Sequence, residues 1–332
     1  MNLHTLHHAL PSFDEIPRLP GLPKGCTWGL WDADGQPDEL GTLNLLTPKV
    51  VIEAVKEVRL GVSVSLNLSL DQPSVPVFKR KPLEHTIIDN SDFSPSQSFD
   101  DTISLNTQAC SQWDGLRHVV HEQSGLLYNG VPKEQITGAH STTRLGIDRW
   151  HQRGGVVARG VLVDYVAYAQ RHGISYLPTE RHDIRIQELD RAAQEQGVTF
   201  HQGDILIVRS GLVRWQTGCL NPEEPAIWAR ANDKACVGVA AVPETVEWLW
   251  NRHFSAVAGD ALAWESVPYP ADRPSLHQHL IPMFGMPIGE LWDLEELAST
   301  CARLGRYSFL VTSTPLRVPG GVASPPNAIA IF

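Results

Sequence analysis

Two short segments of the chain carry the residue types that acid–base or metal chemistry requires. The first is SQWDGLRHVVHE, in which Gln112 and Asp114 flank Trp113 and His118 follows four residues after the aspartate. Side chains two residues apart on an extended segment point to the same face, so Gln112 and Asp114 are expected to lie side by side. A carboxylate, an amide oxygen and an imidazole can bind a divalent cation or carry out acid–base catalysis.

The second segment is LHQHLIPMFGMPIGELWDL, which contains His277 and Glu290. Taken singly, the histidine is explained by ordinary packing, and the glutamate by a favourable interaction with a helix N-terminus. His279 is an alternative to His277. A functional site is predicted only if the two segments, which are far apart in the chain, meet at one cavity.

Hydrophobic periodicity indicates the elements that would position these residues. Thr47 and Pro48 predict the start of a helix that Gly61 could end, and the apolar residues of 62–70 alternate as in a strand. The order helix then strand returns three times, at 185–196 before 205–210, 243–251 before 254–259, and 294–304 before 307–313. This order predicts an α/β fold with a mixed β-sheet core and flanking helices.

The remaining stretches suggest how the chain is organised. Residues 1–40 are rich in Pro and Gly and carry Trp28 and Trp31, which indicates an irregular N-terminal arm over the core. Residues 71–101 are loop-like and are predicted to form a lid or substrate loop. With no linker or repeat, residues 1–332 are expected to form a single catalytic domain.

Composition excludes several classes of function. The net charge is −10 with no basic stripe, which excludes a nucleic-acid-binding surface. No apolar stretch is long enough for a membrane span and the first residues lack a signal-peptide pattern, so a cytoplasmic protein is expected. The five cysteines are widely spaced and are expected to be reduced thiols.

Seven blocks of the sequence, in order, resemble the cyclase family that includes kynurenine formamidase and isatin hydrolase. The blocks are DELGTLNLLTPKVV, QWDGLRH, RGVLVDY, GDILIVRSG, AGDALAWES, LHQHLIPMFGMPIGELWDL and TPLRVPGGVASPPNAIAIF. The resemblance spans most of the chain and implies the swivelling β/β/α architecture of that family. Because members are commonly homo-oligomeric, it also implies a homo-oligomer.

The resemblance also implies a set of site residues. Members carry a motif HxGTHxDxPxH whose histidines and aspartate bind metal. Asp114 matches the aspartate of this motif, and His118 matches its last histidine. Gln108 and Gln112 stand where the two earlier histidines are expected. The later metal ligands match His277 and Glu290. Since a neutral amide is a poor zinc ligand, one ion of Mn or Zn is favoured over two, and a metal-free site stays open.

Three functional hypotheses follow. The first is an enzyme that hydrolyses or closes a lactone, lactam or aryl-amide type bond of a small molecule through a metal-activated water, with Gln112, Asp114, His277 and Glu290 as metal ligands. The second is a metal-independent cyclase or dehydratase of secondary, polyketide-like metabolism. It would use Asp114 and His118 as acid and base, with Gln108 or Gln112 donating to an oxyanion. The third is a non-catalytic binding protein. Trp113 and His121 are further candidates for the substrate pocket.

Overall fold

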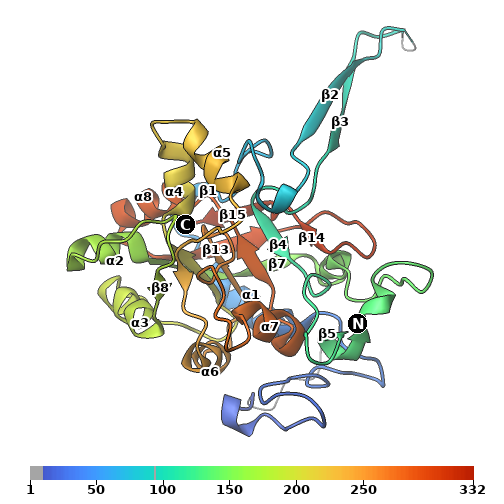
Figure 1. Cartoon of the computed structure of the whole chain (residues 1–332), viewed down its shortest axis with the longest axis vertical. Helices are drawn as coiled ribbons and strands as arrows, with labels where there is room; N and C mark the ends of the chain where they lie inside the picture. Colours follow the sequence, from blue (N-terminus) through green and yellow to red (C-terminus); the bar gives the residue numbers. More distant parts are fainter. Residues whose placement is uncertain (1–9, 93–94) are drawn as a thin grey trace.

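The structure, a computed structural model, describes residues 10–92 and 95–332, and its centre is a mixed β-sheet (Figure 1). Within the described residues this sheet has nine strands in the order β1-β15-β13-β7-β9-β11-β12-β4-β14. Their bounds are β1 (Ser63–Ser65), β15 (Ala328–Ile331), β13 (Ser308–Ser313), β7 (Val156–Asp164), β9 (Ile205–Arg209), β11 (Ala256–Gly259), β12 (Ile288–Glu290), β4 (Gln112–Asp114) and β14 (Ala323–Ser324). Neighbours from β7 to β12 run parallel, and the other pairs are antiparallel.

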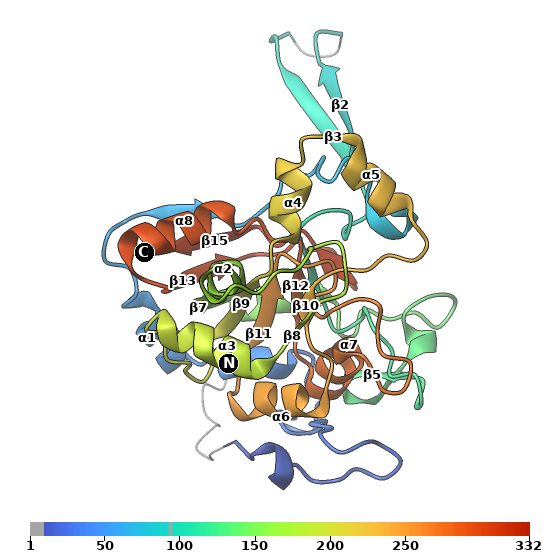
Figure 2. The same ribbon diagram turned by 60° about the vertical axis from the view of Figure 1, so that its left-hand side comes forward.

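Helices cover both faces of the parallel strands, as buried parallel strands require. Along β9, Leu206 and Val208 pack in one core cluster, whereas Ile205 and Ile207 pack in a second cluster on the opposite face. The first cluster includes residues of α2 (Tyr165–His172), α3 (Ile186–Glu195), α6 (Pro243–Asn251) and α7 (Leu276–His279). Figure 2 shows α2, α3 and α6 along this side of the sheet. Residues of α8 (Glu295–Leu304) join the second cluster, against which α1 (Pro48–Val55) packs Val50.

The smaller elements connect this framework. The remaining helices are α4 (Leu212–Gly218), α5 (Glu223–Arg230) and the short turns η1 (Phe13–Glu15), η2 (Gly41–Leu45), η3 (Val77–Lys79), η4 (Tyr128–Gly130), η5 (Lys133–Gln135), η6 (Ile147–Arg153) and η7 (Leu280–Phe284). The remaining strands are paired in twos: β2 (Glu84–Asp89) with β3 (Phe99–Ser104), β5 (Leu126–Leu127) with β6 (Val131–Pro132), and β8 (Asp183–Ile184) with β10 (Gly238–Val239). No described helix combines the length and apolar character that crossing a bilayer would take.

The predicted α/β fold and its helix–strand order are confirmed, with two local differences. Thr47 caps α1 as predicted, but the helix ends at Val55 because the next residues form tighter turns. Gly61 instead bonds the carbonyl of Phe332 beside the sheet edge. The strand predicted over 62–70 pairs only at Ser63–Ser65, because the side-chain amide of Asn67 takes over the bonds to Ala328.

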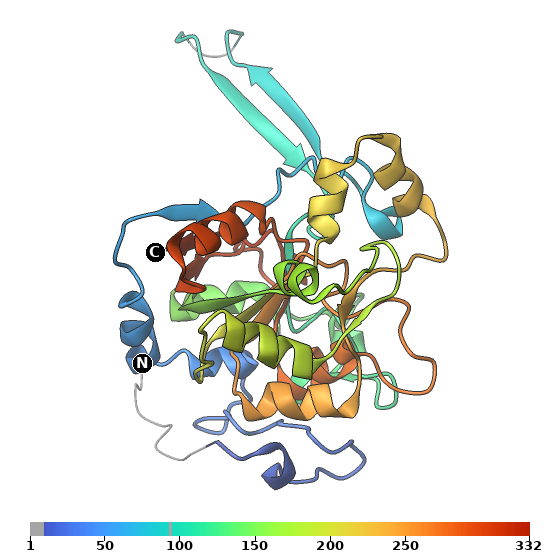
Figure 3. The same cartoon turned by 90° about the vertical axis from the view of Figure 1, so that its left-hand side faces the viewer.

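The loop predicted over residues 71–101 contains regular structure that the sequence analysis missed. β2 and β3 form an antiparallel hairpin, and Figure 3 shows it extending away from the body of the molecule. Its strands contain the β-branched runs Thr86–Ile88 and Thr102–Ile103, which favour a pleated conformation. Because the neighbouring stretches are rich in Pro and Ser, the whole segment was interpreted as a loop and its two strands were not predicted.

Apart from η1, residues 10–40 are irregular and pack on their own chain. Trp250 Nε1 donates to the carbonyl of Pro11 (2.8 Å), and Trp28 Nε1 donates to that of Pro282 (2.6 Å). Trp31 packs against Trp250. Residues 1–9 of the predicted arm lie outside the described residues.

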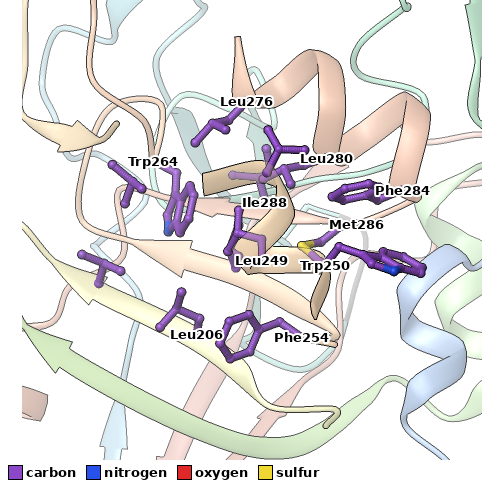
Figure 4. Packing of buried hydrophobic residues seen from close by; sticks show 14 of the residues in the cluster. Leu206, Leu249, Trp250, Phe254, Trp264, Leu276, Leu280, Phe284, Met286 and Ile288 are labelled. Atoms are coloured by element: carbon purple, nitrogen blue, oxygen red, sulfur yellow. The ribbon is translucent and has the colours of Figure 1, made fainter. Parts of the chain in front are cut away.

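One apolar cluster fixes the two segments that carry His277 and Glu290 (Figure 4). Leu276 and Leu280 from the α7–η7 segment pack in the same core as Ile288 of β12. All three side chains are buried. The backbone on either side of the candidate site is therefore held by close packing, which permits little displacement. The five cysteines all lie within the described residues, and none forms a disulfide.

Candidate active site

The pairing of β4 with β12 places an amide and two carboxylates on one face of the sheet. Glu290 lies directly opposite Gln112, and Ile288 lies opposite Asp114. Because opposite residues share a face, the side chains of Gln112, Asp114 and Glu290 converge. Gln112 Nε2 donates to Glu290 Oε2 (2.5 Å) and to Asp114 Oδ1 (3.2 Å). Glu290 ends a strand of the parallel set, where α/β sheets commonly bind ligands.

His277 reaches this cluster from α7 and is oriented by Glu265, in the loop after β11. Glu265 accepts hydrogen bonds from the backbone N–H groups of Leu276 (2.5 Å) and His277 (2.9 Å). Its Oε1 also lies 2.7 Å from His277 Nδ1. The other ring nitrogen, Nε2, is thereby directed to Glu290 Oε1 at 3.0 Å and Asp114 Oδ2 at 3.7 Å. A carboxylate that fixes one ring nitrogen while the other faces the site is the usual support of a metal-binding histidine.

His118 completes the cluster after a turn that follows β4. Its backbone N–H bonds the carbonyl of Gly115, and its Nε2 lies 3.4 Å from Asp114 Oδ2. Gln108 Nε2 donates to Asp114 Oδ1 (2.7 Å) and lies 3.3 Å from His118 Nδ1. His118 retains partial exposure and lines the cavity, whereas Asp114 is fully buried. His118 is therefore the imidazole of the pair that a small molecule can reach.

The two buried carboxylates of the cluster differ in charge. Burial raises the pKa of Asp114, but the imidazoles of His118 and His277 outweigh it and hold that pKa below its ordinary value. Burial, followed by the negative charge of Asp114, raises the pKa of Glu290 to about 7. Asp114 therefore keeps its charge, and Glu290 is the carboxyl that holds a proton more readily.

The pKa values of His118 and His277 are shifted in opposite directions. Burial lowers the pKa of His118, and the attraction of Asp114 compensates only in part. Burial would lower the pKa of His277 as well, but its contacts with Asp114, Glu265 and Glu290 raise it well above the ordinary value. Without a cation, His277 is thus the positive partner of the carboxylates, while His118 is neutral and able to accept a proton.

The donor set fits one divalent cation. Ligand atoms of Asp114, His118 and His277 all lie within 4.8 Å of one another. Asp114 Oδ2 is buried and accepts no hydrogen bond from any residue that the structure describes. A buried carboxylate oxygen normally accepts hydrogen bonds, so one that accepts none and faces imidazole nitrogens at 3.4 and 3.7 Å fits a bound cation. Glu290 lies close enough to His277 to serve as a further oxygen ligand.

A cavity of about 190 Å³ opens onto these groups. Arg80, from the segment before the β2–β3 hairpin, lines it, and Arg80 Nη1 donates to the carbonyl of Gln108 (2.8 Å). A larger cavity of about 500 Å³ lies between α2 and α4, and the described residues that line it form no cluster of acids and bases, so we assign the chemistry to the smaller one. The smaller cavity is lined by Phe78, Arg80, His118, Val119, Glu122, Leu262, Ala263, Tyr269, Ser275, His277, Gln278 and Glu290.

The structure brings together six of the residues singled out from the sequence and separates three others. Those that meet are Gln108, Gln112, Asp114, His118, His277 and Glu290. Trp113 points to the opposite face of β4, where it packs against Trp150 and Trp292 in the core. His121 lies in a turn, with Nδ1 2.9 Å from Ser124 Oγ. The metal group contains His277 and not the alternative His279.

Three residues of the site were missed by the sequence analysis: Arg80, Glu265 and Tyr269. Glu265 follows Trp264 in one of the blocks that resemble the cyclase family, so its block was noted but its role was not. Arg80 lies in the run KRK within a stretch that looked like a loop. A solvated basic run and a site-lining arginine look alike in sequence, and only the fold separates them.

Known proteins place the chain in a family. A family described as "Putative cyclase" matches residues 42–266. A crystal structure titled as that of a novel cyclase is 34% identical, covers 92% of this chain and 99% of its own, and has a TM-score of 0.80. No curated protein sequence matches the chain.

More distant structures share the fold. Isatin hydrolase A from Ralstonia solanacearum is 16% identical over 84% of this chain and 94% of its own, with a TM-score of 0.57. Isatin hydrolase A from Labrenzia aggregata, bound to benzyl benzoate, is 15% identical over 87% of this chain and 98% of its own, with a TM-score of 0.56. With more than half of its length matched by the family and a solved relative of the same class, the chain belongs to the cyclase family.

Proposed function

We propose that this protein is an enzyme that hydrolyses or closes a lactone, lactam or aryl-amide type bond in a small organic molecule, with one Mn²⁺ or Zn²⁺ ion. The observation that carries the proposal is Asp114 Oδ2, which is buried and accepts no hydrogen bond from the described residues, with His118 Nε2 at 3.4 Å and His277 Nε2 at 3.7 Å. The cyclase family and the isatin hydrolases of the same fold support a reaction at a carbonyl group.

Asp114, His277 and Glu290 would hold the cation, which would polarise the substrate carbonyl and acidify a water molecule. The protein's own groups handle the proton. A basic side chain beside the attacking water would take one proton as the water oxygen forms its bond to the carbonyl carbon. That proton then passes to the leaving nitrogen or oxygen as its bond to the carbon breaks. His118, exposed to the cavity and with a lowered pKa, is the group suited to this transfer.

The amide side chains favour a second candidate, a metal-independent cyclase or dehydratase of polyketide-like metabolism. Gln108 and Gln112 donate to Asp114 Oδ1, and Gln112 also donates to Glu290, so two of the carboxylate oxygens already accept hydrogen bonds from the protein. Arg80 adds a fixed positive charge beside the same cavity. In this mechanism His118 takes a proton from the substrate carbon or hydroxyl, with Asp114 orienting the ring.

Elemental analysis together with chelation distinguishes the two candidates. The purified full-length protein is assayed for Mn and Zn content and for turnover of a panel of small lactones, lactams (isatin among them) and aryl amides, before and after EDTA. We expect close to one ion per chain, loss of turnover on chelation and its return with added Mn²⁺. Turnover that is unchanged in metal-free protein would remove the metal mechanism and support the second candidate.

Replacing Glu265 with glutamine is expected to weaken cation binding by about 10- to 100-fold, the usual effect of losing the group that orients a metal-binding histidine. Glutamine keeps the size of the side chain but lacks the charge that fixes the His277 ring through Nδ1. Isothermal titration with Mn²⁺ measures the change. Glu122→Gln, on the rim of the same cavity, is the matched control and should bind as wild type does. Equal losses in both variants would show that only the general charge of the cavity matters.

A further inference from the structure

Arg80 brings a positive charge to the cavity of the candidate active site without forming an ion pair. Its Nη1 donates to the carbonyl of Gln108 at 2.8 Å and to Gln112 Oε1 at 3.4 Å, and both acceptors are neutral. No carboxylate among the described residues lies within ion-pair distance of it, whereas its neighbour Lys81 pairs with Glu84. Its Nε and Nη2 donate to no described residue, so a ligand in the cavity has N–H donors to bind.

Gln112 fixes this charge at the edge of the acid–base cluster. Its amide oxygen accepts from Arg80, and its nitrogen donates to Glu290 Oε2 at 2.5 Å and to Asp114 Oδ1 at 3.2 Å. Arg80 and His118 line the same cavity. A substrate whose reacting carbonyl lies at His118 would therefore place a neighbouring substituent beside the guanidinium.

The backbone before Arg80 presents an aromatic ring to the same cavity. Phe78 and Lys79 have φ angles of 57° and 56°, in the left-handed region that bulky side chains rarely adopt. Strained backbone of this kind is concentrated at ligand-binding sites. Phe78 lines the cavity and is 58% exposed, and its ring centroid lies 5.3 Å from Arg80 Cζ. The exposed ring is a flat apolar surface beside the guanidinium, which suits a planar ring in the ligand.

The rest of the cavity limits the ligand to a compact and mostly apolar molecule. Val119, Leu262 and Ala263 form apolar parts of its lining. Its volume of about 190 Å³ is below the roughly 300–1,000 Å³ of sites that bind drug-sized ligands. Glu122 lies on the rim, but it is exposed and forms no ion pair with Arg80. A ligand with one ring and one acidic group matches this lining.

We propose that Arg80 binds a carboxylate of the substrate, and that the substrates of this site are small aromatic acids whose carboxylate lies on the ring beside the reacting group. A planar guanidinium forms two parallel N–H···O bonds with a carboxylate, and the ring of the acid would pack on Phe78. One guanidinium matches a single negative charge, which favours a carboxylate over a phosphate. This inference rests on the proposed function and narrows its substrate class.

Binding of matched neutral and acidic compounds tests the inference without turnover. Isothermal titration of the full-length protein uses two pairs, benzamide with benzoate and acetanilide with 2-acetamidobenzoate, before and after EDTA. Wild type is expected to bind the acid of each pair about 10- to 100-fold more tightly, the usual effect of hydrogen bonds to a charged group. The preference should remain after EDTA, because Arg80 and not a metal ion provides it.

Variants of Arg80 separate its charge from its shape. Arg80→Gln should weaken binding of the acids about tenfold or more and leave binding of the neutral compounds nearly unchanged. Arg80→Lys keeps the charge but lacks the planar pair of donors, so it should retain only part of the preference. Lys81→Gln is the matched control. It removes a positive charge from the next residue, whose Nζ bonds Ser104 and Glu84, and should bind both compounds as wild type does.

Phe78→Leu tests the aromatic surface. Because the ring contact is common to the acid and the neutral compound, this variant should weaken binding of both by a similar factor, about two- to tenfold. Unchanged binding of both compounds would remove Phe78 from the inference. Melting curves of each variant are recorded in parallel to identify loss of the fold.

The preference for acids decides the outcome. A wild type that binds neither acid, or that binds acids and neutral compounds equally, would overturn the inference. Equal weakening of acids and neutral compounds by Arg80→Gln, or the same loss in Lys81→Gln, would overturn it as well. The proposed function fails separately, since a protein that turns over no compound but still prefers acids through Arg80 would lose the assigned reaction and keep the assigned ligand class.

Discussion

Replacing His118 with alanine is expected to lower kcat by about 10²- to 10⁴-fold, the usual contribution of a positioned acid–base group. The side chain is the cavity-facing imidazole of the cluster, and burial keeps its pKa below the ordinary value despite the nearby Asp114. Both candidate mechanisms need it. Turnover is measured on the best substrate of the lactone, lactam and aryl-amide panel, with the melting temperature recorded in parallel.

His121→Ala is the matched control for this variant. It makes the same chemical change three residues later, where the imidazole bonds Ser124 in a turn. Its kcat should stay close to that of wild type. If His118→Ala retained wild-type turnover while folding normally, the acid–base group would have to lie elsewhere.

Asp114→Asn should abolish stoichiometric cation binding and remove the turnover that depends on it. The substitution keeps the shape of the side chain but removes the negative charge of Oδ2, which accepts no hydrogen bond from the described residues, and an amide is a weak ligand for such ions. We expect a loss of about 1–3 kcal/mol in the free energy of unfolding, the cost of disturbing a buried hydrogen-bonded group. His277 would keep Glu265 and Glu290 as partners, which limits this loss.

Asp204→Asn separates the effect on binding from the effect on folding. Asp204 is also buried and bonds Arg159 through both carboxylate oxygens, at 2.9 and 2.7 Å. It lies outside the cluster of Asp114, His118 and His277. The control variant should therefore lose stability and still bind Mn²⁺. Equal loss of Mn²⁺ binding in both variants would attribute the effect of Asp114→Asn to unfolding.

Local periodicity predicted much of the fold. The helices and strands at 186–209, 243–259 and 295–313 follow from apolar repeats and caps, because their burial is set by a few neighbouring residues. The alternation that placed Gln112 and Asp114 on one face also follows from local geometry, and the same rule sends Trp113 to the opposite side. The hairpin of β2 and β3 was missed because its strands contribute little to the core, so burial leaves no apolar pattern in them.

The assembly of the site was harder to predict. That Glu290 would lie opposite Gln112 depends on the pairing of two strands distant in the chain, which no local pattern specifies. The resemblance to the cyclase family supplied the expectation that the two segments meet. It did not supply Arg80, which reaches the cavity from a segment outside the matching blocks, or the ring orientation that Glu265 imposes on His277. Such supporting contacts depend on the packed backbone.

Anomalous diffraction from crystals grown with Mn²⁺ tests the central claim most directly. The claim is that Asp114, His277 and Glu290 form one cation-binding centre beside His118. Data collected at the manganese edge should show a single strong peak in each chain, within coordination distance of Asp114 Oδ2 and His277 Nε2. A cluster without a peak in crystals of a protein that binds Mn²⁺ in solution, or a peak bound by other residues, would contradict it.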